Sequence, residues 1–250
     1  MAAPTGTPAP KLSAKKPAPK AKAGTRQAAP VESGPCRIGV IPVVGDVFAV
    51  QKVGLTIFNI EYAEVPIEAW GLDDLVVAHV RAAAGPGTGV RRIAYPREAF
   101  APYDHPAPSL FGRPESNLTN IVRQVTANAG CERYVVVTKI NSQLEGTNQT
   151  MRGIGVYNRN LGSLISHSRL FASIQVTVFD GQTYEIAKRP FDLGAAFAKS
   201  LAGENPLTRL DDAAFPEPAA AAASSAILRE GARALLAESL DKTLPDLLRQ

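Results

Sequence analysis

The chain has 250 residues, of which 45% are hydrophobic, and its formal net charge is +4 at pH 7. Residues 1–30 contain six basic side chains and no acidic one, which leaves 21 basic and 23 acidic side chains for residues 31–250. The positive charge therefore belongs to the N-terminal segment and excludes a strongly basic folded surface. No apolar run approaches the roughly 18 residues that a membrane-spanning helix needs, so no transmembrane segment is expected.

The N-terminal segment, residues 1–35, consists mainly of Pro, Ala, Lys and Thr. Such a segment buries too little apolar surface to offset the entropy lost on ordering, so it is predicted to be a disordered basic tail. Its charge would attract an anionic surface, including nucleic acid or a membrane, in a salt-sensitive way. It has no aromatic residue to stack on bases, so no sequence-specific nucleic-acid binding is expected. Alternatively, residues 1–35 serve only as a soluble spacer and bind nothing.

The first residues lack the apolar stretch of a signal peptide, which taken literally predicts a cytoplasmic protein. A Pro/Ala/Lys-rich spacer directly before a folded domain is also typical of the segment that comes after an export signal. A periplasmic or envelope-associated location therefore stays open if a signal was missed upstream.

Residues 36–250 are predicted to form one domain that mixes strands and helices. Period-2 alternation and short β-branched runs predict strands, whereas apolar residues three and four apart predict helices. The predicted strands are 37–44, 47–58, 89–95, 134–140, 150–157, 170–179 and 183–189. The predicted helices are 72–84, 117–129 and a long C-terminal helix from about Pro218 that Pro245 kinks or restarts, with a Pro-rich loop at 96–114.

This order of elements predicts an α/β fold with a mixed β-sheet flanked by two middle helices and the C-terminal helix. Short right-handed crossovers would place both middle helices on one face of the sheet, with the C-terminal helix across the sheet or against its edge. Ser116 is expected to cap the second helix. Asp180-Gly181 predicts a tight turn that pairs the strands 170–179 and 183–189 as a hairpin.

The two cysteines each stand just before an apolar strand: Cys36 before 37–44 and Cys131 before 134–140. If these strands are parallel neighbours, both cysteines lie at the same edge of the sheet, within reach of a disulfide. Two buried free thiols are the alternative, and they are the simpler interpretation because free cysteine packs as a small hydrophobe.

A search for catalytic motifs finds none. The sequence has no H-E-x-x-H, C-x-x-C or G-x-S-x-G pattern, and Gly85-Pro86-Gly87-Thr88-Gly89 lacks the Lys-Ser/Thr of a phosphate-binding loop. We therefore expect no enzyme activity, no cofactor and no metal. The one acid after a strand at the carboxyl edge of the sheet is Asp46, so the alternative is a small, hydrolase-like α/β enzyme that uses Asp46, Asn141 and His105.

Four segments form a recognisable pattern: the strand Arg37–Val43, a helix opening with Asp73-Asp74, the strand Tyr134–Ile140 after Gly130-Cys131, and the run Leu170–Thr183. Over Arg37–Arg189 this pattern resembles the TolB N-terminal-like, LpoB-like and CsgG-like α/β domains of bacterial envelope proteins. The resemblance implies a non-enzymatic role: binding a partner protein, activating a wall synthase or contributing to an assembly. The chain departs from the lipid-anchored members because no lipobox precedes Cys36.

Two segments are predicted to contact a protein partner, because domains of this kind use exposed strand edges and loops. The residues concerned are Asp46, Gln51 and Lys52 in the segment 46–54, and Tyr157, Asn158 and Arg159 in a predicted loop. The leading hypothesis is an envelope binding or scaffold protein. The small enzyme and a cytoplasmic polyanion-binding protein that uses the tail are the alternatives.

Overall fold

The computed structural model describes residues 35–54, 60–105, 114–143, 149–160, 166–187 and 207–249. All of them belong to one compact unit, which spans Glu32–Gln250. The segment predicted to be a disordered tail lies, except for its last residue, outside the described residues.

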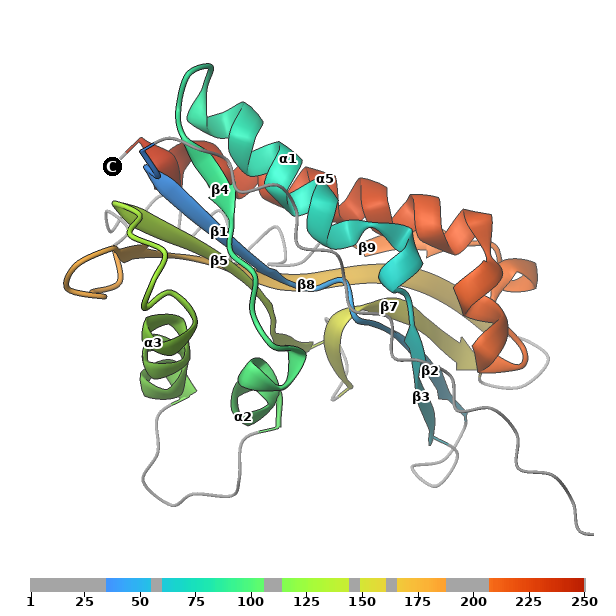
Figure 1. The fold of residues 1–250 in the computed structure, drawn as a ribbon. Helices are drawn as coiled ribbons and strands as arrows, with labels where there is room; N and C mark the ends of the chain where they lie inside the picture. Colours follow the sequence, from blue (N-terminus) through green and yellow to red (C-terminus); the bar gives the residue numbers. More distant parts are fainter. Residues whose placement is uncertain are drawn as a thin grey trace, which may run out of the picture. The chain divides into compact units, whose positions relative to one another are not determined.

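A mixed sheet forms the centre of the fold (Figure 1). Its nine strands within the described residues are β1 (Ile38–Val43), β2 (Val47–Val53), β3 (Ile60–Pro66), β4 (Val90–Arg92), β5 (Arg133–Lys139), β6 (Asn141–Gln143), β7 (Thr150–Asn160), β8 (Ser166–Asp180) and β9 (Leu207–Leu210). The strand order is β3-β2-β7-β8-β5-β1-β4, with β6 beside β7 and β9 beside β8. The predicted α/β class with a mixed sheet is confirmed.

Strand β1 lies between β4 and β5 and runs parallel to both. It is buried at all six positions, as expected for a parallel strand with both faces covered. The register pairs Ile38 with Arg133 and Val43 with Thr138. The carboxyl ends of β1 and β5 therefore meet at the same edge of the sheet.

The helices are α1 (Leu72–Ala84), the single turn α2 (Ala101–Asp104), α3 (Pro114–Val125) and α5 (Ala226–Leu248), with short 3-10 turns η1 (Glu68–Trp70), η2 (Arg97–Phe100), η3 (Asp212–Ala214) and η4 (Ala219–Ser224). Helix α1 has the predicted bounds. Helix α3 begins at Pro114, so Ser116 lies inside it rather than at the capping position. Pro245 does not interrupt α5, which continues to Leu248.

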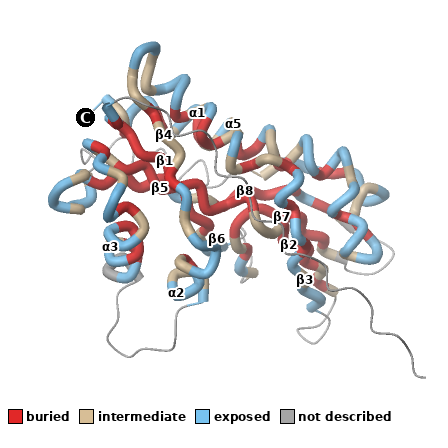
Figure 2. Tube along the Cα trace, in the orientation of Figure 1, coloured by how far each residue is buried: buried red, intermediate tan, exposed pale blue. Residues whose placement is uncertain are grey.

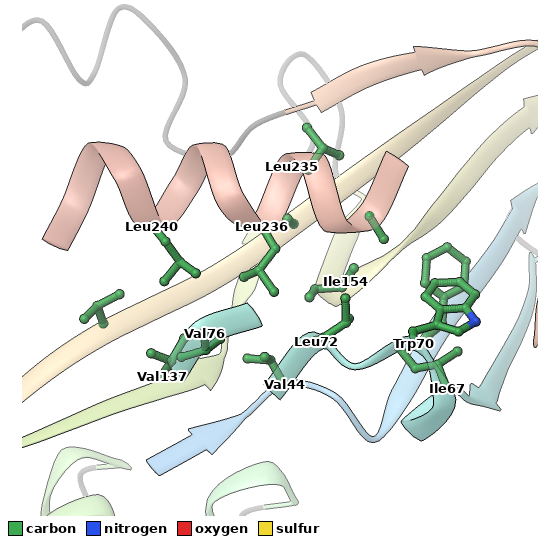
Figure 3. Close-up of a cluster of buried hydrophobic side chains, with 14 of the residues drawn as sticks. Val44, Ile67, Trp70, Leu72, Val76, Val137, Ile154, Leu235, Leu236 and Leu240 are labelled. Carbon is green, nitrogen blue, oxygen red and sulfur yellow. The ribbon is translucent and has the colours of Figure 1, made fainter. Parts of the chain in front are cut away.

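One face of the sheet is covered by α1 and α5, which pack on each other (Figure 1). Figure 3 shows side chains of both helices, including Leu72 and Leu236, converging on Val137 and Ile154 of the sheet. Burial runs along the strands and the inner sides of these helices (Figure 2). Removal of this apolar surface from water is the main stabilising contribution in such a core.

The opposite face of β1 and β5 is covered by α3. Its buried cluster contains Ile41, Leu118, Val122 and Val136, and residues from α1 are not part of it. The expectation that both middle helices cover one face was therefore wrong: α1 and α3 lie on opposite faces. An apolar stripe shows that a helix is buried on one side, but it does not specify which face of a sheet it covers.

Cys36 and Cys131 form a disulfide within this second cluster, with their Cα atoms 4.5 Å apart. Both residues shortly precede the parallel pair β1 and β5, and the backbone N–H of Glu132 donates to the carbonyl of Cys36 at 3.0 Å. The two strands that follow the cysteines are parallel neighbours, which is the arrangement that the sequence analysis required for a disulfide. The cysteines are therefore bonded to each other and are not two free thiols.

The predicted hairpin of 170–179 with 183–189 is formed only next to its turn in the described part of the chain. Phe179 forms an antiparallel bridge with Ile186, and beside it the Asp180 N–H donates to the Glu185 carbonyl and the Ala187 N–H donates to the Val178 carbonyl, both at 2.9 Å. Strand β8 also pairs antiparallel with β5, β7 and β9. The local turn is present, because the Asp180 carboxylate accepts from the backbone N–H groups of Gln182 and Thr183 at 2.8 and 2.7 Å.

Further elements differ from the sequence predictions, and strands β6 and β9 were not predicted. The loop predicted at 96–114 contains η2 and α2, and the loop predicted at 157–160 is the end of strand β7. Strand β3 was not predicted. None of the helices in the described chain is long and apolar enough to cross a membrane.

Candidate functional site

The carboxyl ends of β1 and β5 bring together an acid and a base that are 93 residues apart in the sequence. The Lys139 ammonium donates to both carboxylate oxygens of Asp46, at 2.7 and 2.9 Å. Asp46 lies in the turn after β1, where the backbone N–H of Gly45 is held by the Asp73 carboxylate at 2.8 Å. Lys139 is the last residue of β5. The predicted acid therefore has a partner that the sequence did not indicate.

Burial makes this ion pair different from the surface pairs of the protein. The Lys139 side chain is only 7% exposed, whereas that of Asp46 is 30% exposed. The lysine stem passes close to Gly153 of β7, where an added Cβ would lie 2.8 Å from the Lys139 Cδ. Gly153 has φ +66, a left-handed conformation that glycine adopts without strain. This glycine leaves room for the lysine to reach Asp46.

Further charged pairs surround this position. The Arg97 guanidinium donates to the Glu68 carboxylate, and this hydrogen bond lowers the pKa of Glu68 and raises that of Arg97. The negative charge of Asp46 partly opposes the lowering of the Glu68 pKa and adds to the raising of the Arg97 pKa. Arg152 donates to Asp104 at 2.8 Å. The Glu68 and Asp104 carboxylates are therefore each engaged by an arginine.

No hydrogen bond or ion pair joins Asp46, Asn141 and His105, the three residues of the enzyme alternative, to one another in the described part of the chain. Asp46 is engaged by Lys139, and the Asn141 side chain accepts from Arg152 at 3.4 Å. His105 follows α2, and its backbone N–H donates to the carbonyl of Ala101. Within the described ranges, no group of three His, Cys, Asp or Glu residues is placed to hold a metal ion.

The six residues predicted to contact a partner are not presented together on one surface. Gln51, Tyr157 and Asn158 are buried, and the Asn158 side-chain amide donates to the Ser168 hydroxyl at 2.8 Å. Lys52 donates a hydrogen bond to its ion-pair partner Glu217, and this bond raises the pKa of Lys52. Arg159 is half-buried. The segment 46–54 is not a sheet edge, because β2 pairs with β3 on one side and β7 on the other.

Among the described strands, the free edge on that side of the sheet is β3, which pairs with β2 over seven residues. Two large apolar side chains of β3 are exposed: Ile60 at 43% and Tyr62 at 50%. The Tyr62 hydroxyl donates to the Glu64 carboxylate at 2.8 Å, and burial of the phenol together with this hydrogen bond raises the pKa of Tyr62. An exposed strand edge bordered by apolar side chains is a template for pairing with another strand.

Sequence reasoning missed Lys139 and β3 for different reasons. A lysine at the end of the otherwise apolar run 134–138 is a usable signal, because a charge there must find a partner or reach solvent. Strand β3 offers a weak signal, since only Val65 among its seven residues is buried.

Comparison with known proteins gives little more than a distant likeness. No protein-family model and no curated protein matches the chain. One solved structure, described as the hypothetical protein CT253 from Chlamydia trachomatis, is similar at 8% sequence identity and a TM-score of 0.33, over 87% of this chain and 100% of that chain.

Proposed function

We propose that this chain is a non-enzymatic binding or scaffold protein of a bacterial cell envelope, and that it binds a protein partner along the free edge of β3. The observation that carries the proposal is the exposure of Ile60 and Tyr62 on a seven-residue edge strand. The edge strand of a sheet is a surface to which an extended peptide can add as a further strand.

The hydrogen-bonding geometry of β3 suits strand addition. The backbone N–H of Ile67 points inward, since it donates to the carbonyl of Asp46 at 3.0 Å. In an antiparallel pair, inward and outward residues alternate, so Tyr62 and Glu64 direct their N–H and C=O groups away from β2. Pro66, two positions after Glu64, also faces away from β2. Because proline has no N–H, its position there costs no hydrogen bond to β2.

Export to an oxidising compartment is the second part of the proposal, and the Cys36–Cys131 disulfide supports it. Disulfides persist in the periplasm and outside the cell, whereas cytosolic thiols are normally kept reduced. Lys139 engages both oxygens of Asp46, and this structural use of the carboxylate weighs against the enzyme alternative.

Binding at β3 is tested by placing a photo-crosslinking amino acid at position 62 of the full chain in cells of the source bacterium. We expect an adduct of defined mass that is absent when the crosslinker replaces Gln182, an exposed turn residue. Glu64→Pro removes an outward N–H donor, whereas Glu64→Ala removes the same carboxylate but keeps the donor. The proline variant should lose the adduct and the alanine variant should keep it. Equal adducts from both variants would refute strand addition.

The compartment is tested separately by fractionating cells that express the untagged gene and measuring the mass of the recovered protein without reductant. Recovery from the envelope or periplasm with a mass about 2 Da below that of the dithiol form is the expected result. An unprocessed cytoplasmic protein with two free thiols would overturn export while leaving binding at β3 open to its own test.

A further inference from the structure

Three arginines gather on the face of β7, β8 and β9 that is turned away from α5. Arg169 of β8 lies directly opposite Arg209 of β9, and Arg159 of β7 lies opposite His167 of β8. Side chains two positions apart on a strand lie on the same face of the sheet, so Arg159 lies on the face of Tyr157 and Arg169 on the face of Phe171. Tyr157 and Phe171 belong to an apolar cluster separate from that of α5, in which Leu170 packs. We refer to Arg159, Arg169 and Arg209 as the arginine cluster.

The charge of the arginine cluster is not compensated in the described part of the protein. None of the three guanidinium groups takes part in an ion pair there, and Arg169 and Arg209 are exposed. Asp211, two residues beyond Arg209, accepts from the backbone N–H of Ala213 at 2.9 Å. Like charges directly opposite each other on a sheet are destabilising. A fold that keeps Arg169 against Arg209 therefore retains a repulsion that an anion would remove.

A buried hydroxyl lies beside this cluster. Tyr157 is fully buried, its ring packs with Met151 and Phe171, and its hydroxyl has no hydrogen-bond partner among the described groups. Tyr157 lies directly opposite Arg169 across β7 and β8, and Arg159 follows Tyr157 by two positions on the same face of β7. Burial raises the pKa of Tyr157, and the positive charges of Arg159 and Arg169 oppose this rise. A buried donor without an acceptor is rare in native proteins and calls for an explanation.

We propose that the arginine cluster and the Tyr157 hydroxyl form a binding site for a phosphate group. A phosphate offers several acceptor oxygens and up to two negative charges, which suits three guanidinium groups and a neutral O–H donor better than the single charge of a carboxylate does. The ligand is either a soluble phosphate or the headgroup of an anionic phospholipid, since both present phosphate oxygens as acceptors; a phosphodiester headgroup carries one negative charge.

Calorimetric titration of the full chain with inorganic phosphate, at constant ionic strength, tests the site. We expect saturable binding that Arg159→Gln combined with Arg169→Gln weakens by about tenfold or more. Arg229→Gln is the matched control, because Arg229 lies on α5 and its nearest acid, Glu230, is 3.8 Å away. Equal binding by the wild type and the double variant, or a loss shared by the Arg229 control, overturns the site.

Tyr157→Phe tests the hydroxyl without changing the packing of the ring. We expect phosphate binding to weaken several-fold while the melting temperature without phosphate stays the same or rises, because an unpaired buried donor is removed. Arg209→Gln should also raise the phosphate-free melting temperature at low salt and reduce the stabilisation that phosphate gives. Unchanged phosphate binding by Tyr157→Phe overturns the assignment of Tyr157 to the site.

Co-sedimentation with phosphatidylcholine vesicles, with and without phosphatidylglycerol, distinguishes the two sources of phosphate. The N-terminal basic residues are the same in all variants, so a difference between wild type and the double variant reports the cluster alone. Phosphatidylglycerol-dependent binding lost in the double variant indicates a lipid headgroup, and a response to inorganic phosphate alone indicates a soluble ligand; either supports the site. Binding only to a single-stranded oligonucleotide, with no response to phosphate or vesicles, overturns the proposal.

Discussion

Lys139 and Asp46 form a two-oxygen ion pair in which the lysine is nearly inaccessible to water and the aspartate is partly accessible. The pair joins the ends of two parallel strands, so it fixes the turn between β1 and β2 against β5. Its two members are not equivalent, because removing the aspartate leaves a buried charge without a partner. Removing the lysine leaves a carboxylate that water can reach.

Asp46→Ala is therefore expected to lower the free energy of unfolding by about 2 to 4 kcal/mol, and Lys139→Met by clearly less. Urea unfolding of both variants measures the difference. Asp74→Ala is a suitable control, because Asp74 pairs with Arg92 while its own side chain is 77% exposed, and such surface pairs contribute about 1 kcal/mol or less. Equal losses for Asp46→Ala and Lys139→Met would contradict the structural asymmetry of the pair.

The Cys36–Cys131 disulfide closes a loop with a sequence separation of 95. Crosslinking so long a loop restricts the unfolded chain, and loops near this length correspond to about 4 to 5 kcal/mol in the chain-entropy description. The double variant Cys36→Ala, Cys131→Ala should lose stability of this order in urea unfolding without reductant. Adding dithiothreitol should destabilise the wild type and leave the double variant unchanged. A shared response to the reductant would show that another process is responsible.

Gly155 lies where β2, β7 and β8 meet. A Cβ at this position would collide with the Ala49 backbone carbonyl and with the Phe171 ring. Gly155→Ala should therefore lower the free energy of unfolding by about 2 to 3 kcal/mol through overpacking. Gly130→Ala is the comparison, because nothing lies within 4 Å of its added Cβ and only its φ of +60 is unfavourable for alanine. That variant should lose about 1 kcal/mol, and a larger loss than for Gly155→Ala would contradict the steric argument.

The carboxyl group of Asp180 is expected to make the folded protein less stable as the pH falls into the acidic range. The backbone N–H groups of Thr183 and Gln182 stabilise its carboxylate and lower its pKa. A carboxyl group whose pKa is lower in the folded than in the unfolded protein adds stability above the unfolded value, about 4, and loses it as the pH falls through the folded value. Asp180→Asn keeps an oxygen acceptor but removes this titration. Its melting temperature should fall less than that of the wild type between about pH 7 and about pH 3, and equal falls would count against the assignment.

Local pattern was sufficient for the buried elements of this fold. Strand β1 and helix α1 appear where the sequence places them, because their apolar residues follow one period without interruption and all or part of their surface is buried. The same reasoning could not find β3, whose exposed position at the edge leaves no periodic apolar signal. The strand is held by backbone bonds to β2, which do not depend on side-chain type.

Long-range pairing decided what the local signals could not. Asp180-Gly181 forms the turn that the sequence predicts, yet among the described residues the pairing beyond it amounts to one bridge, between Phe179 and Ile186. The long pairings of β8 are with β5, β7 and β9, over different parts of its length. Tyr157 and Asn158 were predicted to lie in a surface loop, but they continue β7, where partners on both sides bury them.

The sequence by itself determined the α/β class, the bounds of the first helix, the position of Asp46 after a buried strand and the condition under which Cys36 and Cys131 meet. The tertiary structure alone decided that α1 and α3 cover opposite faces, that Lys139 is the partner of Asp46, that β3 is an edge strand of the sheet and that Arg169 faces Arg209. The physical reason is the range of the interactions. Hydrophobic period and turn chemistry act over a few neighbouring residues, whereas strand order brings together side chains that are far apart in the sequence and fixes which of them are buried, paired or left as unbalanced charge.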